Sequence, residues 1–356
     1  MPIRVLHVES GHEWRATRDQ VRLLVDGLRG EPHIHQAVAT LEGSRLARET
    51  EEMGVPVVPL PWATGTDPRA LRMLAKVAAT DWDVLHAHDT QALRLLVYVQ
   101  ALEGSRTALV ASRRVVGLPA SGWKWRRARV VLAVSNGARR DLLAAGVEPC
   151  RVIVVRSGID VGELHPQLVG RLRDRVGARD EHLLVGSDAA LEANRDHETL
   201  VRAAVGVSER QDRARFALLG DGPARRRLEA LIDRYGLAGR VCLPGFVPDA
   251  RRSLADCDVF VLPARGEELA TSALDALGAG VPVVLPTGDG PERFVGSGIV
   301  PVPRGDPVAM AEAIGGLLDD PERRRRLGEQ GRRFAEAHGR DRMVRGTLRA
   351  YRTVMH

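Results

Sequence analysis

Short apolar runs alternate with longer amphipathic stretches along the first half of the chain. Stretches such as RDQVRLLVDGLRG (18–30) and DPRALRMLAKVAAT (67–80) repeat apolar residues with the period of a helix that buries one face. The runs between them are continuously apolar, as expected for strands of a parallel sheet that is covered on both faces. Strands are predicted in this half at 3–8, 35–40, 55–60, 83–88, 107–112 and 129–135.

The alternation starts again after an irregular stretch at 156–170 that contains glycine and proline. After about residue 304 the pattern is purely helical. We therefore predict an α/β fold in which two Rossmann-like, doubly wound parallel-sheet domains face each other across a cleft. The expected domains are 1–160 and 161–340, followed by a helix at 341–356 that returns to the N-terminal domain. Strands of the second half are predicted at 182–187, 215–220, 240–245, 258–264 and 281–286.

Composition narrows the classes of function. The net charge of +6 is carried by basic residues that are spread along the chain, which argues against a nucleic-acid-binding protein. Cys150, Cys242 and Cys257 are far apart and lack metal-ligand spacing, so neither a disulfide nor a zinc site is expected. The start MPIRVLHVES resembles a strand more than a signal peptide, and no apolar run is long enough to span a membrane. A cytoplasmic protein is expected.

In open α/β sheets, ligands bind beyond the carboxyl ends of the strands. Ala16 and Thr17 lie where the first strand turns into a helix, whose N-terminus could hold a phosphate. His86 and His88 follow on one face of the fourth strand. No further cluster supplies the remaining ligands of a zinc site, so a hydrogen-bonding role is favoured over a metal. We expect the ligand site between the domains, lined by the loops after residues 8, 88, 112, 220, 245 and 264.

Basic residues follow the fifth strand. Arg113 and Arg114 are placed to meet an anionic ligand. The segment at 123–129 mixes tryptophan with lysine and arginine, a composition that suits a membrane interface. The alternative is a helix whose tryptophans pack inward, and the short length of the segment favours that alternative.

In the second half, Gly220 opens a loop between a strand and a helix, and Gly245 and Phe246 follow the next strand, where a nucleotide base could stack. The stretch RGEELATSALDALGAG (265–280) predicts a loop and then a helix capped by Thr271 or Ser272. Glu267 precedes this helix and Asp275 lies one turn inside it. A diphosphate at the helix N-terminus would then have a carboxylate on either side.

In their order and spacing, these motifs resemble the nucleotide-sugar glycosyltransferases of the GT-B fold, family four, which retain anomeric configuration. The resemblance covers nearly the whole chain. The signature of that family is a pair of glutamates separated by seven residues, which corresponds here to Glu267 and Asp275. Its other motifs read HVESGHEWRATRDQV, DVLHAHD, AVSNGARRDLLAAGV, RVIVVRSGID, LLGDGPARRRLE, VCLPGFVPD, CDVFVLPA and GDPVAMAEAIGGLLDDPE.

The resemblance implies a metal-independent enzyme without a cofactor, which moves sugar from a nucleotide-diphosphate donor to a glycan or lipid-linked acceptor in cell-envelope or glycoconjugate synthesis. Arg195 stands at the position of the family's lysine, and Ala189 or Ala190 at that of its arginine. Asp275 would hold the nucleotide ribose. Together with the residues at the strand ends, the resemblance gives Glu267, Arg195, His88 and Arg114 as the predicted catalytic residues. The predicted donor-binding residues are Ala16, Thr17, Gly220, Gly245, Phe246, Glu268, Leu269, Ala270, Thr271, Ser272 and Asp275.

Four departures from the family pattern keep alternatives open. Ala16-Thr17 replaces a glycine pair, ELA replaces a glycine-rich turn, the second glutamate is the shorter Asp275, and alanine stands at the position of the family's arginine. One alternative is a degenerate GT-B protein that binds a glycan, a lipid or a partner without catalysis. Another is a sugar-nucleotide 2-epimerase, although the paired carboxylates argue against it. A peripheral contact with the inner face of a membrane, through 123–129, is a further possibility.

Overall fold

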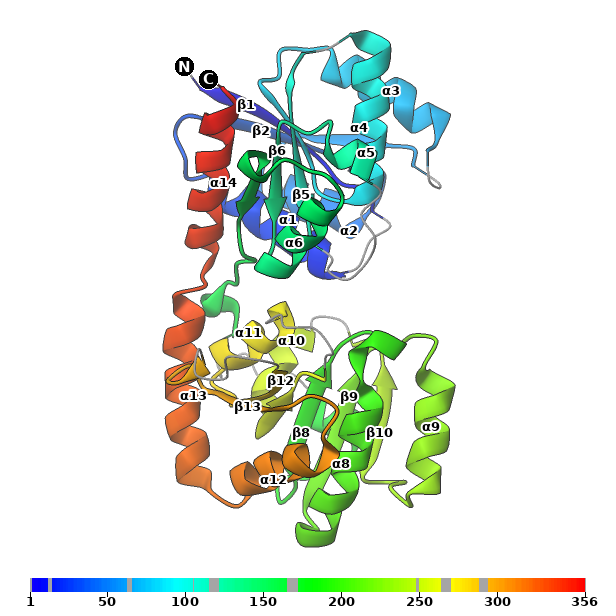
Figure 1. Cartoon of the computed structure of the whole chain (residues 1–356), viewed down its shortest axis with the longest axis vertical. Coiled ribbons are helices and arrows are strands. Elements are labelled where there is room, and N and C mark those ends of the chain that lie inside the picture. The colour runs from blue at the N-terminus through cyan, green and yellow to red at the C-terminus, as the bar shows by residue number, and fades with distance from the viewer. Residues whose placement is uncertain are drawn as a thin grey trace. The chain divides into compact units, whose positions relative to one another are not determined.

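The chain folds into two compact α/β units in the computed structural model (Figure 1). The first unit comprises Met1–Gly158 and Arg340–His356, and the second comprises Ile159–Gly339. The C-terminal helix is therefore part of the first unit, although it follows the second unit in the sequence. The structure describes residues 2–11, 15–62, 66–104, 106–114, 122–164, 172–247, 250–263, 270–287 and 294–355.

The first unit is built on a seven-stranded sheet whose paired strands are all parallel, in the order β3-β2-β1-β4-β5-β6-β7. The order reverses between β1 and β4, so the loops after these two strands diverge to opposite faces and leave a crevice at their carboxyl ends. The strands are β1 (Ile3–Val8), β2 (Ile34–Leu41), β3 (Val57–Leu60), β4 (Val84–Ala87), β5 (Ala108–Arg113), β6 (Val130–Ala133) and β7 (Val152–Val154).

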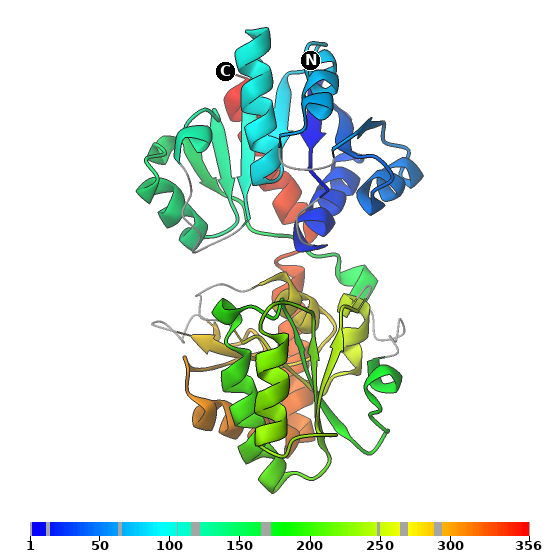
Figure 2. The same cartoon turned by 90° about the vertical axis from the view of Figure 1, so that its right-hand side faces the viewer.

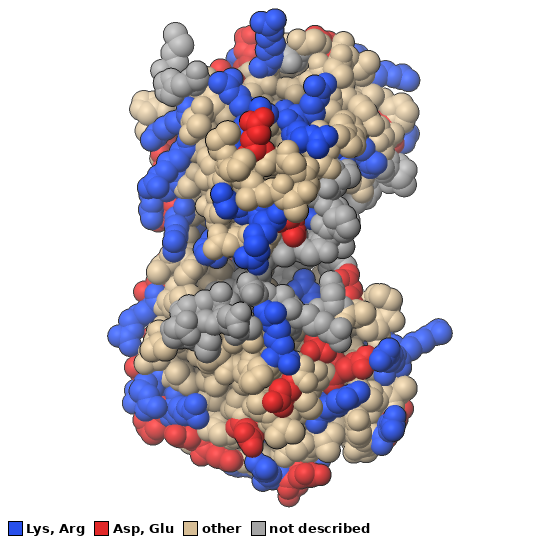
Figure 3. Space-filling model, in the orientation of Figure 1, with Lys and Arg blue, Asp and Glu red and all other residues tan. Residues whose placement is uncertain are grey.

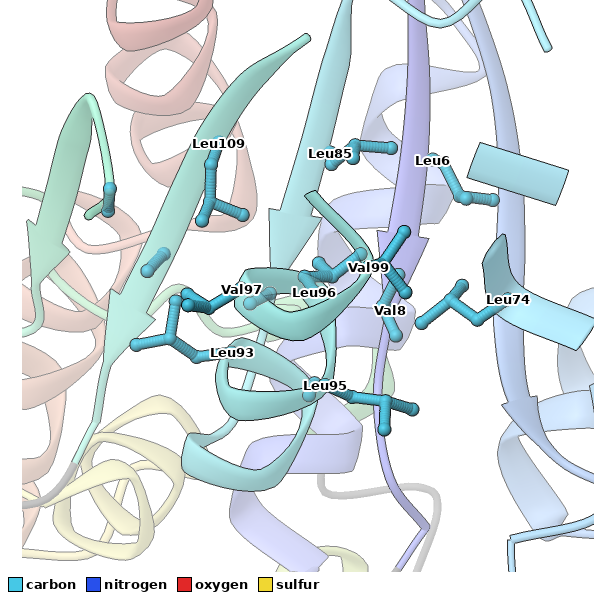
Figure 4. Close-up of a cluster of buried hydrophobic side chains, with 14 of the residues drawn as sticks. Leu6, Val8, Leu74, Leu85, Leu93, Leu95, Leu96, Val97, Val99 and Leu109 are labelled. Atoms are coloured by element: carbon cyan, nitrogen blue, oxygen red, sulfur yellow. The ribbon is translucent and has the colours of Figure 1, made fainter. Parts of the chain in front are cut away.

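Helices cover both faces of this sheet, and Figure 2 shows α4 in front of it and α14 behind it. One apolar core packs α3 and α4 against the sheet, through side chains such as Leu74, Leu93 and Leu96 (Figure 4). On the other face, Leu24 and Tyr351 belong to the core beneath α1 and α14. The helices are α1 (Arg15–Leu28), α2 (Arg45–Glu52), α3 (Pro68–Ala78), α4 (Thr90–Glu103), α5 (Gly122–Trp125), α6 (Asn136–Ala144), η1 (Pro149–Arg151) and α14 (Arg340–Val354).

The second unit repeats this plan with a six-stranded parallel sheet in the order β10-β9-β8-β11-β12-β13. Its strand order reverses between β8 and β11. The strands are β8 (Leu183–Asp188), β9 (Ala214–Leu219), β10 (Val241–Gly245), β11 (Val259–Val261), β12 (Val283–Thr287) and β13 (Ile299–Pro303).

Two apolar cores pack the helices of the second unit against its sheet. The longer of these helices follow the strands, as a doubly wound fold requires. The helices are η2 (Val161–Leu164), α7 (Leu172–Val176), η3 (Ala193–Arg195), α8 (His197–Arg210), α9 (Arg225–Arg234), α10 (Ala250–Ser253), η4 (Leu254–Asp256), α11 (Thr271–Gly278), α12 (Pro307–Leu318) and α13 (Pro321–Glu336).

The predicted fold class is confirmed, and each predicted strand overlaps an observed one. Two edge strands, β7 and β13, were not predicted. β7 has only three residues. β13 reads IVPVP, and proline is accepted in a sheet mainly at an edge, where its missing N–H faces no partner strand.

Candidate functional site

Three histidines meet at the reversal of strand order in the first unit. His7 on β1 and His86 on β4 are register partners, and His88 follows β4 directly. The three ring centroids lie 4.0 to 5.7 Å apart, and all three side chains are fully buried. His86 and His88 could be predicted from their spacing on one strand, but His7 could not, because only the register of β1 against β4 brings it to them.

Hydrogen bonds account for four of the six ring nitrogens in this cluster. His7 Nδ1 lies 2.9 Å from His88 Nε2. His86 Nδ1 lies 2.7 Å from the hydroxyl of Tyr351 on α14, and His86 Nε2 lies 2.8 Å from Ser112 Oγ on β5. Although the three rings are close enough to offer ligands to one ion, both nitrogens of His86 are already engaged by hydroxyls. The geometry favours a network of imidazoles and hydroxyls.

Burial keeps these rings neutral. It lowers the pKa of His7 to about 4, an effect that Gln36 partly opposes. Burial also lowers the pKa of His86 and His88 well below 6.5, and the neighbouring histidines and Arg114 add to the effect. A neutral imidazole has one donor and one acceptor nitrogen, so each ring in the cluster takes one of two tautomers.

Buried carboxylates hold the loops that follow β1 and β4. Asp89 caps α4 by accepting from the backbone N–H groups of Gln91 and Ala92, both at 2.8 Å, and it also accepts from Ser10 N at 2.7 Å. Burial raises the pKa of Asp89, and these backbone donors lower it in part. Glu9 accepts from Gly11 N and from Thr40 Oγ1, both at 2.9 Å. Asp89 thus ties the end of β1 to the start of α4.

The other predicted residues of the first unit lie at the start of α1 and at the end of β5. Ala16 and Thr17 lie in the first turn of α1, and Thr17 is buried. Arg114 lies close enough to lower the pKa of His86 and His88. Arg113 is buried, with its guanidinium 5.5 Å from the centroid of the Trp125 ring. Arg114 is therefore the arginine of this pair that acts on the histidines.

In the second unit, Arg195 belongs to η3, in the connection that follows β8. Its Nε is buried and has no hydrogen-bond partner among the described residues. Asp196 leads into α8 with φ of 48°, a left-handed conformation that few non-glycine residues adopt. The next side chain, His197, is buried, and burial together with the charge of Arg195 lowers its pKa to about 4.

Two glycines bring the loop after β9 against the loop after β8. Gly220 has φ of 121°, and a Cβ there would lie 2.2 Å from the carbonyl oxygen of Ala189. A Cβ on Gly222 would lie 2.5 Å from the carbonyl oxygen of Leu191. Gly220 N also donates to Gly245 O at 2.9 Å, which links the ends of β9 and β10. Only glycine allows this backbone contact.

The start of α11 differs from the prediction. Neither Thr271 nor Ser272 caps the helix, because both already lie inside it; the N-cap is Ala270, which has no side chain able to accept a hydrogen bond. Among the described residues, no N-cap side chain therefore accepts from the first backbone N–H groups of α11. Asp275 lies one turn inside the helix and is half-buried. The predicted residues Glu267, Glu268 and Leu269 lie outside the described residues.

The expected helix at 123–129 is shorter than predicted. Trp125 is buried, whereas the side chain of Trp123 is 43% exposed.

Phe246, at the end of β10, is 59% exposed, as stacking on a ligand would require. Basic and acidic residues are interspersed on the visible face of the second unit (Figure 3). Within the part of the chain that the structure describes, no helix is long and apolar enough to cross a membrane.

Two family models match the chain. The model described as Glycosyltransferase Family 4 matches residues 11–163, and the model described as Glycosyl transferases group 1 matches residues 170–334. The D-inositol 3-phosphate glycosyltransferase of Kineococcus radiotolerans is 30% identical over 306 residues, which cover 78% of this chain and 68% of that protein. The 2-deoxystreptamine N-acetyl-D-glucosaminyltransferase of Streptomyces fradiae is 40% identical over 141 residues, 36% of this chain and 33% of that protein. The latter match spans only a third of that relative.

Among solved structures, HepE of Anabaena in complex with UDP-glucose superimposes with a TM-score of 0.82 at 18% sequence identity. The superposition covers 99% of this chain and 100% of that one. At this identity the likeness shows the fold.

Proposed function

Since this chain belongs to the family 4 glycosyltransferases and has the GT-B fold, we propose that it transfers a sugar from a nucleotide-diphosphate donor with retention of anomeric configuration. The observation that carries the proposal is the strand-order reversal between β8 and β11. There the first turn of α11 follows β11, the glycine loop follows β9, and Arg195 follows β8, the strand that lies between those two. The backbone N–H groups of a helix N-terminus and a guanidinium suit a diphosphate. HepE, which shares the fold, binds UDP-glucose.

In the proposed reaction, the bond between the anomeric carbon and the diphosphate breaks, and a bond from that carbon to an acceptor oxygen forms on the same face. The acceptor hydroxyl gives its proton to the departing diphosphate. The chain would stabilise the negative charge that develops on the leaving group, through Arg195 and the N-terminus of α11. We propose that these groups replace a metal ion and that the enzyme needs no cofactor.

The roles of the carboxylates follow from the family signature. Glu267 would contact hydroxyls of the donor sugar, and Asp275 would bind the ribose. Glu267→Gln should then abolish transfer while nucleotide affinity stays, whereas Asp275→Ala should mainly weaken nucleotide binding. If both variants affected nucleotide binding alone, this assignment would be wrong.

The acceptor is proposed to be a glycan or lipid-linked saccharide of the cell envelope or of another glycoconjugate. The names of two relatives, a 2-deoxystreptamine and an inositol 3-phosphate glycosyltransferase, add polyhydroxylated rings to the acceptors worth testing. We propose that His88 accepts a hydrogen bond from a hydroxyl of the bound substrates. Because His88 is fully buried, the side chains that cover it must move to admit that hydroxyl.

A peripheral contact with an anionic membrane surface is also proposed. Trp123 and Tyr98 lie with ring centroids 6.2 Å apart, and both are partly exposed. Leu102, further along the same helix as Tyr98, is 68% exposed. With Lys124 beside them, they form the kind of aromatic and basic surface that inserts at a lipid headgroup layer. Binding to phosphatidylglycerol vesicles that Trp123→Ala weakens would support this contact, and equal binding by both proteins would exclude it.

Calorimetry with nucleotide diphosphates tests the donor site. Arg195→Ala should weaken binding of UDP or GDP, whichever the chain prefers, by roughly 2 kcal/mol, since a hydrogen bond to a charged group is lost. This equals about a 30-fold rise in Kd. Arg202→Ala, an exposed position on α8, is the matched control and should leave Kd unchanged. If neither diphosphate binds, or if both variants bind like the parent, the non-catalytic alternative is favoured.

A further inference from the structure

The hydrogen bond between His7 and His88 leaves open which ring donates. His7 Nδ1 and His88 Nε2 are 2.9 Å apart, and both rings are neutral, so one nitrogen carries the proton and the other accepts it. If His7 donates, His88 carries its proton on Nδ1. If His88 donates, its Nδ1 is a bare lone pair. These two states have opposite chemistry at Nδ1, because only the second can accept a hydrogen bond from a hydroxyl.

Gln36 on β2 supplies the group that decides between these states. Gln36 pairs in register with Val5, so their side chains point to the same face of the sheet. His7 lies two residues after Val5 on the same strand, so its side chain shares that face as well. Gln36 Nε2 donates to Val25 O on α1 at 2.8 Å. This bond orients the amide and defines Oε1 as the end that remains for another partner.

The remaining end of Gln36 matches the remaining end of His7. Within the described parts of the chain, Gln36 Oε1 and His7 Nε2 are both buried and neither has a hydrogen-bond partner at normal distance and angle. Gln36 nevertheless lies close enough to His7 to raise its pKa, as an amide oxygen facing a ring N–H would. Of the two neutral tautomers of His7, only the one with its proton on Nε2 offers a donor toward Gln36 Oε1. A proton on His7 Nδ1 would instead leave Gln36 Oε1 and the lone pair of His7 Nε2 as two buried acceptors with no proton between them, which is unfavourable.

The tautomer of His7 determines the tautomer of His88. With its proton on Nε2, His7 presents a lone pair at Nδ1, so His88 Nε2 must be the donor. His88 Nδ1 is then unprotonated, and it too is buried without a hydrogen-bond partner among the described residues. We infer that Gln36 and His7 are positioning residues that hold His88 as its Nε2–H tautomer, with the Nδ1 lone pair ready to accept a substrate hydroxyl. The inference rests on the proposed role of His88 in transfer.

Nitrogen-15 NMR of the imidazole side chains tests the tautomer without any substrate. In the wild-type chain at neutral pH, His7 and His88 should both show a protonated Nε2 and an unprotonated Nδ1, with the signals assigned through His7→Phe and His88→Asn. The opposite pattern, with the proton on Nδ1 of His88, would overturn the inference.

Two matched glutamine variants test the positioning role. Gln36→Leu removes the oxygen that faces His7 and one bond to a backbone carbonyl. Gln100→Leu removes an equivalent bond, from Gln100 Nε2 to Thr107 O at 2.7 Å, in the same unit. Both should lower the stability of the unit similarly, but only Gln36→Leu should mix the tautomers of His88 and reduce kcat, by roughly ten- to a hundredfold for a misplaced reacting group.

The outcomes separate this inference from the proposed function. An unchanged His88 tautomer in Gln36→Leu, or a changed tautomer with unchanged kcat, would refute the positioning role of Gln36 and His7. If His88→Asn itself transferred sugar at the wild-type rate, the role of His88 would be refuted instead, whatever its tautomer.

Discussion

Replacing Asp89 by alanine should destabilise the first unit more than the loss of an ordinary helix cap. Two of its backbone bonds cap α4, and a lost cap costs about 1–2 kcal/mol. The third bond satisfies the N–H of Ser10, a fully buried residue, and a buried donor left without an acceptor costs about 1–3 kcal/mol. Burial raises the pKa of this carboxyl, so its removal recovers some desolvation energy. The expected loss is roughly 3 kcal/mol.

Asp67 provides the comparison. It caps α3 by accepting from the backbone N–H of Arg69 at 2.8 Å, and the Arg69 side chain also donates to both carboxylate oxygens, at 3.0 and 3.3 Å. That side chain is 66% exposed, so water weakens this ion pair. Asp67→Ala should therefore cost about 1 kcal/mol.

Tryptophan fluorescence during urea unfolding measures both losses in the right part of the molecule. All five tryptophans lie before residue 158, so their emission reports on the first unit alone. Equal losses in the two variants, or a negligible loss in Asp89→Ala, would show that the bond to Ser10 contributes nothing to the free energy of unfolding.

Two further predictions concern the buried histidine and the glycine loop. Burial lowers the pKa of folded His7 to about 4, so as the pH falls below 6.5 the unfolded chain takes up a proton before the folded chain does. The contribution of His7 to the free energy of unfolding is therefore present above pH 6.5 and is lost toward pH 4, by up to about 1.4 kcal/mol per pH unit for each such histidine. Fluorescence-detected unfolding at pH 7 and pH 5 should show a smaller difference in His7→Phe than in the wild type, and an unchanged difference would contradict the pKa assignment. Gly220→Ala forces a Cβ against Ala189 O, so it should lower the midpoint temperature of unfolding and weaken diphosphate binding. Gly236 is the control, because it has a φ of 64° and no atom lies within 4 Å of an added Cβ. Gly236→Ala should show only the smaller destabilisation that comes from its backbone conformation. Similar melting curves and similar calorimetric affinities for these two variants would refute the contact between the loops.

The fold could be predicted because its strands are covered on both faces. Such strands are continuous apolar runs, and no packing knowledge is needed to find them. β7 and β13 were not predicted because they are edge strands. An edge strand has a partner on one side only, so it can be as short as β7 or contain proline as β13 does.

Candidate site residues could be proposed only where the local sequence or the family resemblance points to them. Gly220 is proposed from its place between a strand and a helix, and Arg195 from the resemblance, whereas His7 joins His86 and His88 only through the register of β1 against β4. The prediction of the N-cap of α11 was wrong for a related reason. ATS offers two residues that favour the N-cap, yet backbone conformation places the boundary one residue earlier, at Ala270.

The central claim, retaining transfer from a nucleotide-diphosphate sugar, is tested most directly by a transfer reaction followed by NMR of the anomeric proton. The purified chain would be incubated with common α-linked UDP- and GDP-sugars and a panel of glycan, lipid-linked and cyclitol acceptors, with and without EDTA. The account predicts an α-linked product with at least one donor, at a rate that EDTA does not change and that Glu267→Gln abolishes. A β-linked product would contradict retention, and intact donors in every mixture would contradict the assignment as an active transferase.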